Sequence, residues 1–217
     1  MSKKPFVLGV LVSGTGTNLQ AILDAVAAGR LQAKVGVVIS NVATAKALDR
    51  AKAARVPAIV VDHKAFPSRE AFDAAVVEVL KAHDVDLVVL AGFMRIVTPT
   101  LLDAFPNRVV NVHPALLPAF PGVRAQKQAL DYGVAISGCT VHFVDAGMDT
   151  GPIIAQAAVP VLDDDDEASL SARILEKEHE LLPTALQWIV EGRVTIEQPE
   201  GKRPRARVRP ASEVGRS

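Results

Sequence analysis

The sequence predicts an α/β fold, with a doubly wound, mostly parallel sheet and an antiparallel strand addition in the C-terminal half. Apolar, β-branched runs alternate with helical patterns through the first half, which is the β-α-β order of a doubly wound sheet. The composition is 49% hydrophobic and only 4% aromatic, a balance of Ala, Val and Leu that suits helices packed on a parallel sheet. With 217 residues, the chain is long enough to bury a core of ordinary size.

The first half alternates five predicted strands with four predicted helices. The strands are Phe6–Val12, Val35–Ser40, Ala58–Asp62, Asp86–Leu90 and Val109–His113. Helical spacing predicts helices over 19–29, over Thr44–Arg55, from the N-cap Ser68 through Leu80, and briefly around Leu101.

The second half changes in style. It holds a helix at Gln126–Tyr132, strands at Ser137–Val144 and Ile153–Val161, and a long helix at Glu167–Glu191 with Pro183 inside it. The turn Asp145–Pro152 joins the two strands, so we expect them to pair antiparallel. We therefore expect one domain over 1–192, with an N-terminal half of about 1–105 and a second half of about 106–192.

The segment 193–217 differs in composition from the rest. Its side chains carry a net charge of +4, and it is rich in proline and small polar residues. We expect a basic, flexible tail, and an anionic partner is its less favoured interpretation.

The overall composition excludes several classes of protein. A net charge of zero gives no general attraction for nucleic acid. The single cysteine, Cys139, excludes an intramolecular disulfide and fits a reducing cytoplasm, so we expect a cytoplasmic protein. The apolar run Phe6–Val12 precedes a glycine loop with no cleavage signal, and no window reaches the ~18 apolar residues of a membrane span.

The loop Ser13–Asn18 follows the first strand and opens the first helix. Its backbone N–H groups and the helix N-terminus can form a cradle for an anion. Leu19 takes the place of the third glycine of a dinucleotide fingerprint, and the loop lacks the Gly-Lys-Ser/Thr of a Walker A motif. A single phosphate group is therefore the better fit, with a tight strand–helix turn as the structural alternative.

Asn111 and His113 lie two apart at the end of an apolar strand, so they point to the same face, about 7 Å apart. A carbonyl between an amide and an imidazole would have its oxygen stabilised as it becomes an oxyanion, which outlines an acyl-transfer site. Asp149, in a turn of small residues, can supply the charge that tunes the histidine. A hydrogen-bonded structural network is the alternative interpretation.

Other candidate residues point to weaker conclusions. His142 lies on a strand as a possible partner of Asp149, with simple packing as the alternative. The remaining histidines have no metal-ligand spacing with one another or with Cys139, so we expect no metal.

Four motifs carry a resemblance to a known family. They are Ser-Gly-x-Gly-x-Asn-Leu at 13–19, Ala-Gly-Phe-Met-Arg at 91–95, Asn-Val-His-Pro-Ala-Leu-Leu-Pro at 111–118 and Gly-x-Thr-Val-His-Phe-Val with Met-Asp-x-Gly-Pro at 138–152. Together the motifs resemble the glycinamide ribonucleotide formyltransferase family, over roughly residues 6 to 190. The resemblance implies a formyltransferase-type Rossmann-like fold. It also implies transfer of a formyl group from 10-formyltetrahydrofolate to the amine of glycinamide ribonucleotide, in purine biosynthesis.

The resemblance also assigns roles to individual residues. It implies that Asn111, His113 and Asp149 are catalytic. The ribonucleotide would contact Gly16, Thr17, Asn18 and Glu178. The folate would contact Arg69, Met94, Arg95, Ile96, Val97, Asn111 and the loop of Asp145, Ala146, Gly147, Met148 and Asp149. Arg124 departs from the family, because that position is often histidine.

Two other functions stay open at this point. A formyl-folate hydrolase would use water in place of the amine, although the phosphate loop argues against it. A non-catalytic sensor of folate or nucleotide would have little need for all three catalytic residues. The expected partners are small molecules, with no nucleic acid and no membrane, and a homodimer is one assembly that the sequence leaves open.

Overall fold

The structure is a computed structural model that describes residues 4–213. It contains two compact units, of which the first runs to Asn111 and the second starts at Val112.

The first unit contains the glycine loop and most of the predicted parallel strands. Its strands are β1 (Phe6–Val12), β2 (Ala33–Ser40), β3 (Ala58–Val60), β4 (Leu87–Leu90) and β5 (Val109–His113), the last of which continues past the unit's end. Its helices are α1 (Thr17–Ala27), α2 (Ala47–Ala53), α3 (Arg69–Ala82) and α4 (Pro99–Ala104), with a 3₁₀ turn η1 (His63–Ala65).

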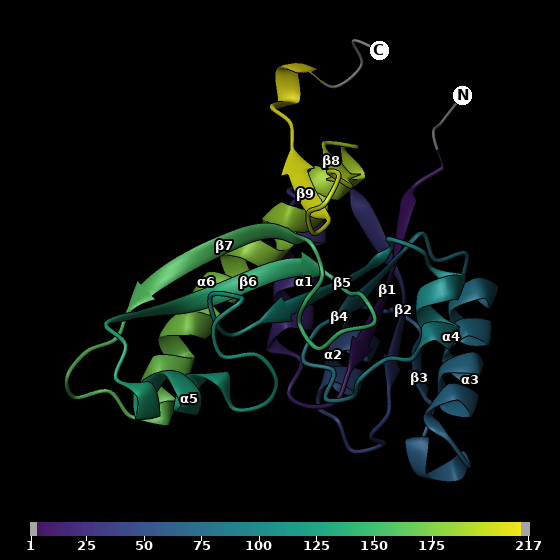
Figure 1. Ribbon diagram of the computed structural model, residues 1–217. Coiled ribbons are helices and arrows are strands. Elements are labelled where there is room, and N and C mark those ends of the chain that lie inside the picture. Colours follow the sequence, from purple (N-terminus) through teal and green to yellow (C-terminus); the bar gives the residue numbers. More distant parts are fainter. Residues whose placement is uncertain (1–3, 214–217) are drawn as a thin grey trace. The chain divides into compact units, whose positions relative to one another are not determined.

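The strands of this unit are parallel and follow the order β3-β2-β1-β4-β5. The order reverses next to β1, because the chain leaves β3 at one edge and returns as β4 on the other side of β1. In Figure 1, α3 and α4 lie together on one side of these strands, and α1 and α2 lie on the other. The predicted doubly wound α/β class is confirmed, and it places the ends of β1 and β4 where such sheets bind ligands.

The second unit contains the predicted antiparallel addition. Its elements are α5 (Ala125–Tyr132), β6 (Ile136–Phe143), β7 (Ile153–Pro160), α6 (Glu167–Val190), β8 (Val194–Glu197), β9 (Arg205–Val208) and η2 (Ala211–Glu213). Strands β6 and β7 pair antiparallel, with Ile136 opposite Pro160 and Thr140 opposite Gln156. The antiparallel pairing is thus confirmed.

The long helix α6 begins at a capping box. Asp166 accepts a hydrogen bond from the Ser169 N–H at 2.8 Å, and the Ser169 hydroxyl accepts one from the Asp166 N–H at 3.0 Å. The helix continues through Pro183. Across residues 4–213, none of the helices is both long and apolar enough to cross a membrane.

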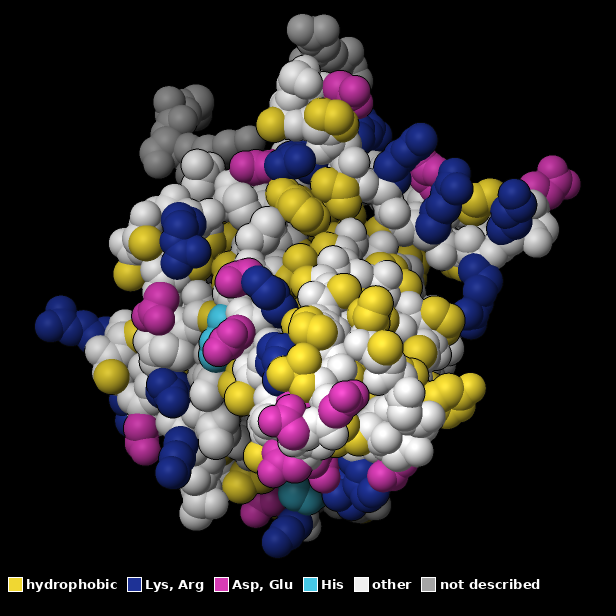
Figure 2. All heavy atoms as spheres, turned by 90° about the vertical axis from the view of Figure 1, so that its left-hand side faces the viewer, with side chains coloured by type: hydrophobic (Ala, Val, Ile, Leu, Met, Phe, Trp, Pro, Cys, Tyr) yellow, Lys and Arg dark blue, Asp and Glu magenta, His cyan; other side chains and the backbone are white. Residues whose placement is uncertain are grey.

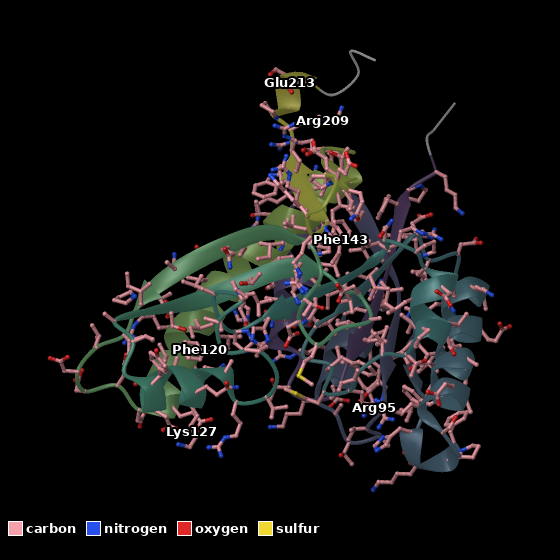
Figure 3. All side chains as sticks on the ribbon, viewed as in Figure 1. Arg95, Phe120, Lys127, Phe143, Arg209 and Glu213 are labelled. Atoms are coloured by element: carbon pink, nitrogen blue, oxygen red, sulfur yellow. The ribbon has the colours of Figure 1, made fainter. Side chains whose placement is uncertain are left out.

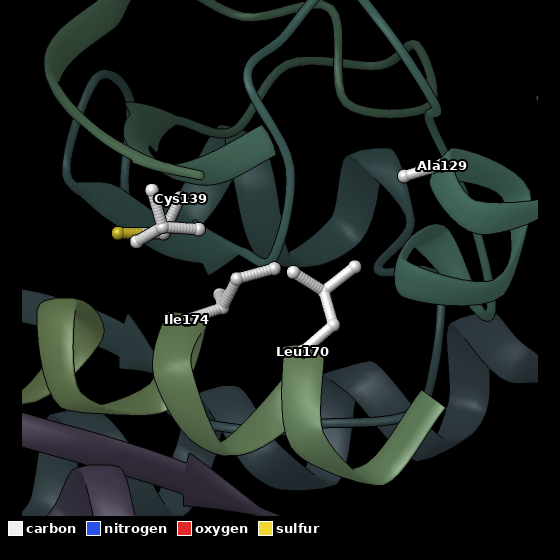
Figure 4. Close-up of a cluster of buried hydrophobic side chains, with 5 residues drawn as sticks. Ala129, Cys139, Leu170 and Ile174 are labelled. Carbon is white, nitrogen blue, oxygen red and sulfur yellow. The ribbon is translucent and has the colours of Figure 1, made fainter. Parts of the chain in front are cut away.

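A buried apolar cluster joins α6 to β6, β7 and α5 (Figure 4). Its fully or almost fully buried members are Ala129, Cys139, Val159, Leu170 and Ile174. Leu170 and Ile174 lie four apart on α6, so both side chains point to the same face of the helix. The apolar residues of α6 that recur at helical spacing thus pack against the second unit, and this packing adds to the helix propensity of the sequence.

The C-terminal segment differs from the predicted flexible tail over residues 194–208. Strands β8 and β9 form an antiparallel hairpin, and the Glu197 carboxylate accepts hydrogen bonds from both Arg205 and Arg207. Arg205 and Arg207 are exposed, whereas Ala206 and Val208 are half-buried. Exposed and half-buried side chains thus alternate as in a β-strand, although the exposed ones are arginines. Figure 2 shows basic and acidic side chains next to one another at the height of this hairpin.

Leu170→Ala should lower the free energy of unfolding by about 2–5 kcal/mol, because it leaves a cavity in the apolar cluster. Urea unfolding followed by circular dichroism measures this change. Leu162→Ala is the matched control, since Leu162 is exposed in the loop before α6, and it should cost less than about 1 kcal/mol. Equal losses in the two variants would contradict the assignment of Leu170 to the core.

The Cys139 thiol should not react with a thiol reagent in the folded protein at pH 8. Burial raises the pKa of this thiol to about 12, so almost no thiolate is present at pH 8. Absorbance after addition of a disulfide reagent such as dithionitrobenzoate measures the reaction. The urea-unfolded protein is the control and should release one equivalent, and rapid reaction of the native protein would refute the prediction.

Candidate active site

His113 is the last residue of β5, and it is only 4% exposed. Its Nε2 atom lies 2.8 Å from the carbonyl oxygen of Phe120, which can only accept, so Nε2 donates to it. Its Nδ1 atom lies 3.5 Å from the Asp149 carboxylate. Both ring nitrogens therefore face acceptors, and only the protonated imidazolium can donate to both.

The carboxylate of Asp149 is 15% exposed and has three neighbours. Its Oδ2 atom accepts a hydrogen bond from the Gly122 N–H at 2.7 Å and faces His113. Its Oδ1 atom lies 3.8 Å from Nε2 of His142. The Asp149 backbone has a φ of 53°, in the left-handed region, which aspartate tolerates better than most residues.

His142 lies on β6 and is buried, with its Nε2 atom 3.8 Å from the Asp149 carboxylate. Its Nδ1 atom donates to the Phe143 carbonyl oxygen at 2.8 Å. Desolvation by burial lowers the pKa of His142, more than the Asp149 charge raises it. The imidazole of His142 is therefore neutral at pH 7.

Hydrogen bonds within the segment 145–150 hold the loop that contains Asp149. The Asp145 carboxylate accepts from the Gly147 N–H at 3.1 Å and from the Thr150 hydroxyl at 2.6 Å. A Cβ atom at Gly151 would overlap the Phe143 carbonyl oxygen, so only glycine fits there. Met148 is exposed at this loop and offers an apolar side chain to solvent.

Asn111 is half-buried on β5, two residues before His113. In the sheet of the first unit, it lies opposite Leu90, the last residue of β4. The register thus puts this carboxamide at the carboxyl ends of the parallel strands, the edge at which doubly wound sheets bind ligands.

The predicted phosphate loop leads into the N-terminus of α1. Gly16 has a φ of 72°, and a Cβ atom there would overlap the side chain of Ala47 on α2. Gly16 is the N-cap of α1, and as a glycine it has no side chain with which to cap the helix. Thr17 and Asn18 are the first two helical residues, so their N–H groups lie at the positive end of the helix dipole. This helix end can take an anion.

Helix α2 supports this loop from behind. The Ala47 N–H donates to the Gly14 carbonyl oxygen at 3.1 Å, and Arg50 Nε donates to the Thr15 carbonyl oxygen at 2.8 Å. Arg50 also donates to Gln20 on α1. The sequence did not indicate Arg50, because its contact is to a backbone oxygen.

The predicted folate segment follows β4 and alternates in exposure. Met94 and Ile96 are 77% and 53% exposed, whereas Val97 is buried. The Arg95 guanidinium lies 4.9 Å from the centre of the Phe72 ring. Figure 3 shows Arg95 near the strand ends where β1 and β2 finish. Arg69 is exposed at the first position of α3.

Two other residues of the predicted site lie in the second unit. Glu178 is buried on α6. Arg124 has a left-handed backbone and forms an ion pair with Glu167 of α6 at 2.7 Å. Arg124 therefore supports the start of α6 through an exposed ion pair.

The structure adds two backbone groups that sequence reasoning missed. These are the carbonyl oxygen of Phe120 and the N–H of Gly122, which contact His113 and Asp149. Phe120, labelled in Figure 3, packs edge-on against Tyr132 of α5, which fixes the segment. The Pro121-Gly122 pair was the only available signal, because it indicates a turn.

Within residues 4–213, no group of three or more His, Cys, Asp or Glu side chains could hold a metal ion.

Comparison with known proteins identifies the family. The model of the formyl transferase family matches residues 8–186. The trifunctional purine biosynthetic protein adenosine-3 of Drosophila melanogaster is 50% identical over 198 residues, which are 90% of this chain and 15% of that protein. The chain thus spans only a small part of this longer relative.

Relatives of similar length also match. The phosphoribosylglycinamide formyltransferase of Mycobacterium tuberculosis is 48% identical over 192 residues, 88% of each chain. The crystal structure of glycinamide ribonucleotide transformylase 1 from Symbiobacterium toebii has a TM-score of 0.91 and 55% identity, over 95% of each chain. The resemblance seen in the motifs is thus confirmed: the chain belongs to the formyl transferase family, in the group of the phosphoribosylglycinamide formyltransferases.

Proposed function

We propose that this chain transfers the formyl group of 10-formyltetrahydrofolate to the amine of glycinamide ribonucleotide, giving N-formylglycinamide ribonucleotide and tetrahydrofolate in purine biosynthesis. The observation that carries the proposal is the pair of the buried His113 and the half-buried Asp149, 3.5 Å apart. The chain that holds this pair is 48% identical to the phosphoribosylglycinamide formyltransferase of Mycobacterium tuberculosis. Asn111, two residues before His113, supplies a hydrogen-bond donor on the same strand.

The chemistry begins with direct attack of the neutral amine on the formyl carbon. The new C–N bond forms as the formyl oxygen becomes an oxyanion, to which Asn111 and protonated His113 donate hydrogen bonds. The C–N bond to the folate then breaks. The amine loses one proton and the leaving folate nitrogen gains one, which His113 can supply, so the reaction consumes no net proton.

His113 needs a free donor for this role. Its Nε2 atom donates to the Phe120 carbonyl oxygen in the structure without substrate. In our proposal Nε2 exchanges this acceptor for the formyl oxygen, while Nδ1 continues to face Asp149. The carboxylate of Asp149 would then lie next to the positive charge of the imidazolium that donates to the oxyanion.

The substrates would be held by groups outside this trio. The N–H groups around Gly16, Thr17 and Asn18 would bind the ribonucleotide phosphate, and Glu178 its ribose and glycinamide end. The folate would contact Arg69, the segment 94–97 and the loop 145–149. The exposed side chains of Met94, Ile96 and Met148 suit an apolar ring system.

One assay tests the function. The protein is mixed with 10-formyltetrahydrofolate, with and without glycinamide ribonucleotide, and deformylated folate is followed by absorbance. Turnover that requires the ribonucleotide supports the transferase. Equal turnover without it means a hydrolase, and binding of both compounds without turnover means a sensor.

His113→Ala and Asp149→Asn should each lower kcat by about 10²–10³-fold, because each weakens the hydrogen bonding of the oxyanion. Steady-state kinetics measures the loss, and circular dichroism checks that both variants fold. Asp131→Asn is the matched control for Asp149→Asn, because Asp131 forms an exposed ion pair with Lys127. Turnover close to wild type in either site variant would remove that residue from the catalytic assignment.

The free energy of unfolding should fall below about pH 6.5, in part through His142. Because burial lowers the pKa of His142 in the folded state, the unfolded chain binds a proton there before the native protein does. This contribution to stability is fully present above the pKa of the unfolded chain. As the pH falls from there to the pKa of the folded protein, up to about 1.4 kcal/mol is lost per pH unit.

Urea unfolding at pH 7.5 and at pH 5.5 measures this contribution. His142→Asn keeps a donor for the Phe143 carbonyl oxygen but does not titrate, so its stability should depend less on pH than that of the wild type. The same pH dependence in both proteins would refute the role of His142.

A further inference from the structure

Ser13 follows the central strand of the first unit. Strand β1 pairs with β2 on one side and with β4 on the other, with Val12 opposite Ser40 and Leu11 opposite Leu90. Because all three strands are parallel, their chains leave the sheet at the same edge. A side chain at position 13 can therefore reach the segments that follow both neighbouring strands.

The Ser13 hydroxyl does reach both segments. It donates to Oδ1 of Asn41, after β2, at 2.6 Å, and it accepts from the Met94 N–H, after β4, at 2.9 Å. The Ser13 N–H also donates to the Gly92 carbonyl oxygen at 3.1 Å. One residue thus ties the segment of Met94 to the strand that begins the predicted phosphate loop.

Asn41 sets the direction of this hydroxyl. A serine hydroxyl has one hydrogen to donate, and Asn41 accepts it, so the lone pairs of the oxygen remain for the Met94 N–H. Asn41 is itself buried, and its backbone carbonyl oxygen lies 3.0 Å from Nδ1 of His63. The Nδ2 atom of the Asn41 carboxamide lies 3.3 Å from the same Nδ1 atom, so His63 contacts both the backbone and the side chain of Asn41.

The segment after β4 is held at both ends, and the Ser13 contact to Met94 holds the first of them. At its other end, the Thr98 N–H donates to the buried Asp73 carboxylate at 2.6 Å. Between these ends, Phe93 stacks on the Phe72 ring of α3 at 6.4 Å and Arg95 lies over the same ring. The side chains of Met94 and Ile96 are left facing solvent.

We propose that Ser13 and Asn41 are positioning residues for the folate-binding segment Gly92–Val97, although Ser13 opens the loop of the ribonucleotide phosphate. Their hydrogen bonds fix the backbone at Met94, and with it the direction of the two exposed apolar side chains. The inference rests on the proposed function and adds to it two residues that contact neither substrate. Neither partner of the Ser13 hydroxyl belongs to the phosphate loop.

The proposal predicts an effect on one substrate only. Ser13→Ala should raise the KM for 10-formyltetrahydrofolate about threefold to tenfold, the scale of one lost hydrogen bond. The KM for glycinamide ribonucleotide should stay within about twofold of the wild type. Asn41→Ala should act in the same direction, and Ser13→Thr, which keeps the hydroxyl, should restore the wild-type KM.

Steady-state kinetics with each substrate varied in turn gives both KM values. Calorimetric titration with tetrahydrofolate, the product, then gives the folate affinity without turnover. Ser40→Ala is the matched control, since the Ser40 hydroxyl also donates one bond and accepts one, at the end of β2, but both bonds go to Val42 in its own turn. It should leave the folate KM unchanged.

The outcomes separate this inference from the function on which it rests. Absence of turnover by the wild-type protein overturns the proposed function. A wild type that turns over, with a Ser13→Ala variant whose ribonucleotide KM rises as much as its folate KM, overturns the positioning role. Failure of Ser13→Thr to restore the folate KM does the same. Should Ser13→Ala not fold, Asn41→Ala gives the same test.

Discussion

The contacts of the Asp149 carboxylate hold together the proposed catalytic groups of the second unit. This carboxylate accepts a hydrogen bond from the Gly122 N–H and lies beside two imidazoles that differ in their surroundings. His142 is kept neutral by burial, whereas His113 has an acceptor at each ring nitrogen. One carboxylate thus lies between two histidines whose ring nitrogens have different partners.

The central position of β1 plays the corresponding part in the first unit. A strand with parallel neighbours on both sides delivers its following residue between two loops, which is why a residue as small as Ser13 can bind to both. The site of a doubly wound sheet is usually described by the loops that touch the ligand. In this unit, hydrogen bonds from Ser13 also connect the segments that follow β2 and β4.

Sequence patterns predicted the elements better than the contacts. β1 and β5 have the predicted bounds, because β1 is a continuous apolar run and β5 is a valine-rich segment that ends just before Pro114. β3 ends at Val60, two residues early, because the Asp62 side chain caps the 3₁₀ turn that follows. The hairpin of β8 and β9 was missed, since its apolar positions alternate with arginines in a segment whose charge resembles that of a disordered tail.

The site was predictable as far as its side chains carry chemistry. Asn111, His113 and Asp149 could be named because their types and spacing suit an oxyanion, and the structure places Asp149 beside His113. The carbonyl oxygen of Phe120 and the N–H of Gly122 could not be named, because every residue has such groups and only the fold selects among them.

The close packing of Gly16 on Ala47 has a thermodynamic consequence for the proposed ribonucleotide. Hydrogen bonds from Ala47 and Arg50 to the loop carbonyls hold the backbone in place before any ligand arrives. A phosphate would then meet donors that are already ordered, and little conformational entropy would be lost on binding. Affinity at this end of the substrate would come from rigidity built into the neighbouring helix rather than from closure of the loop.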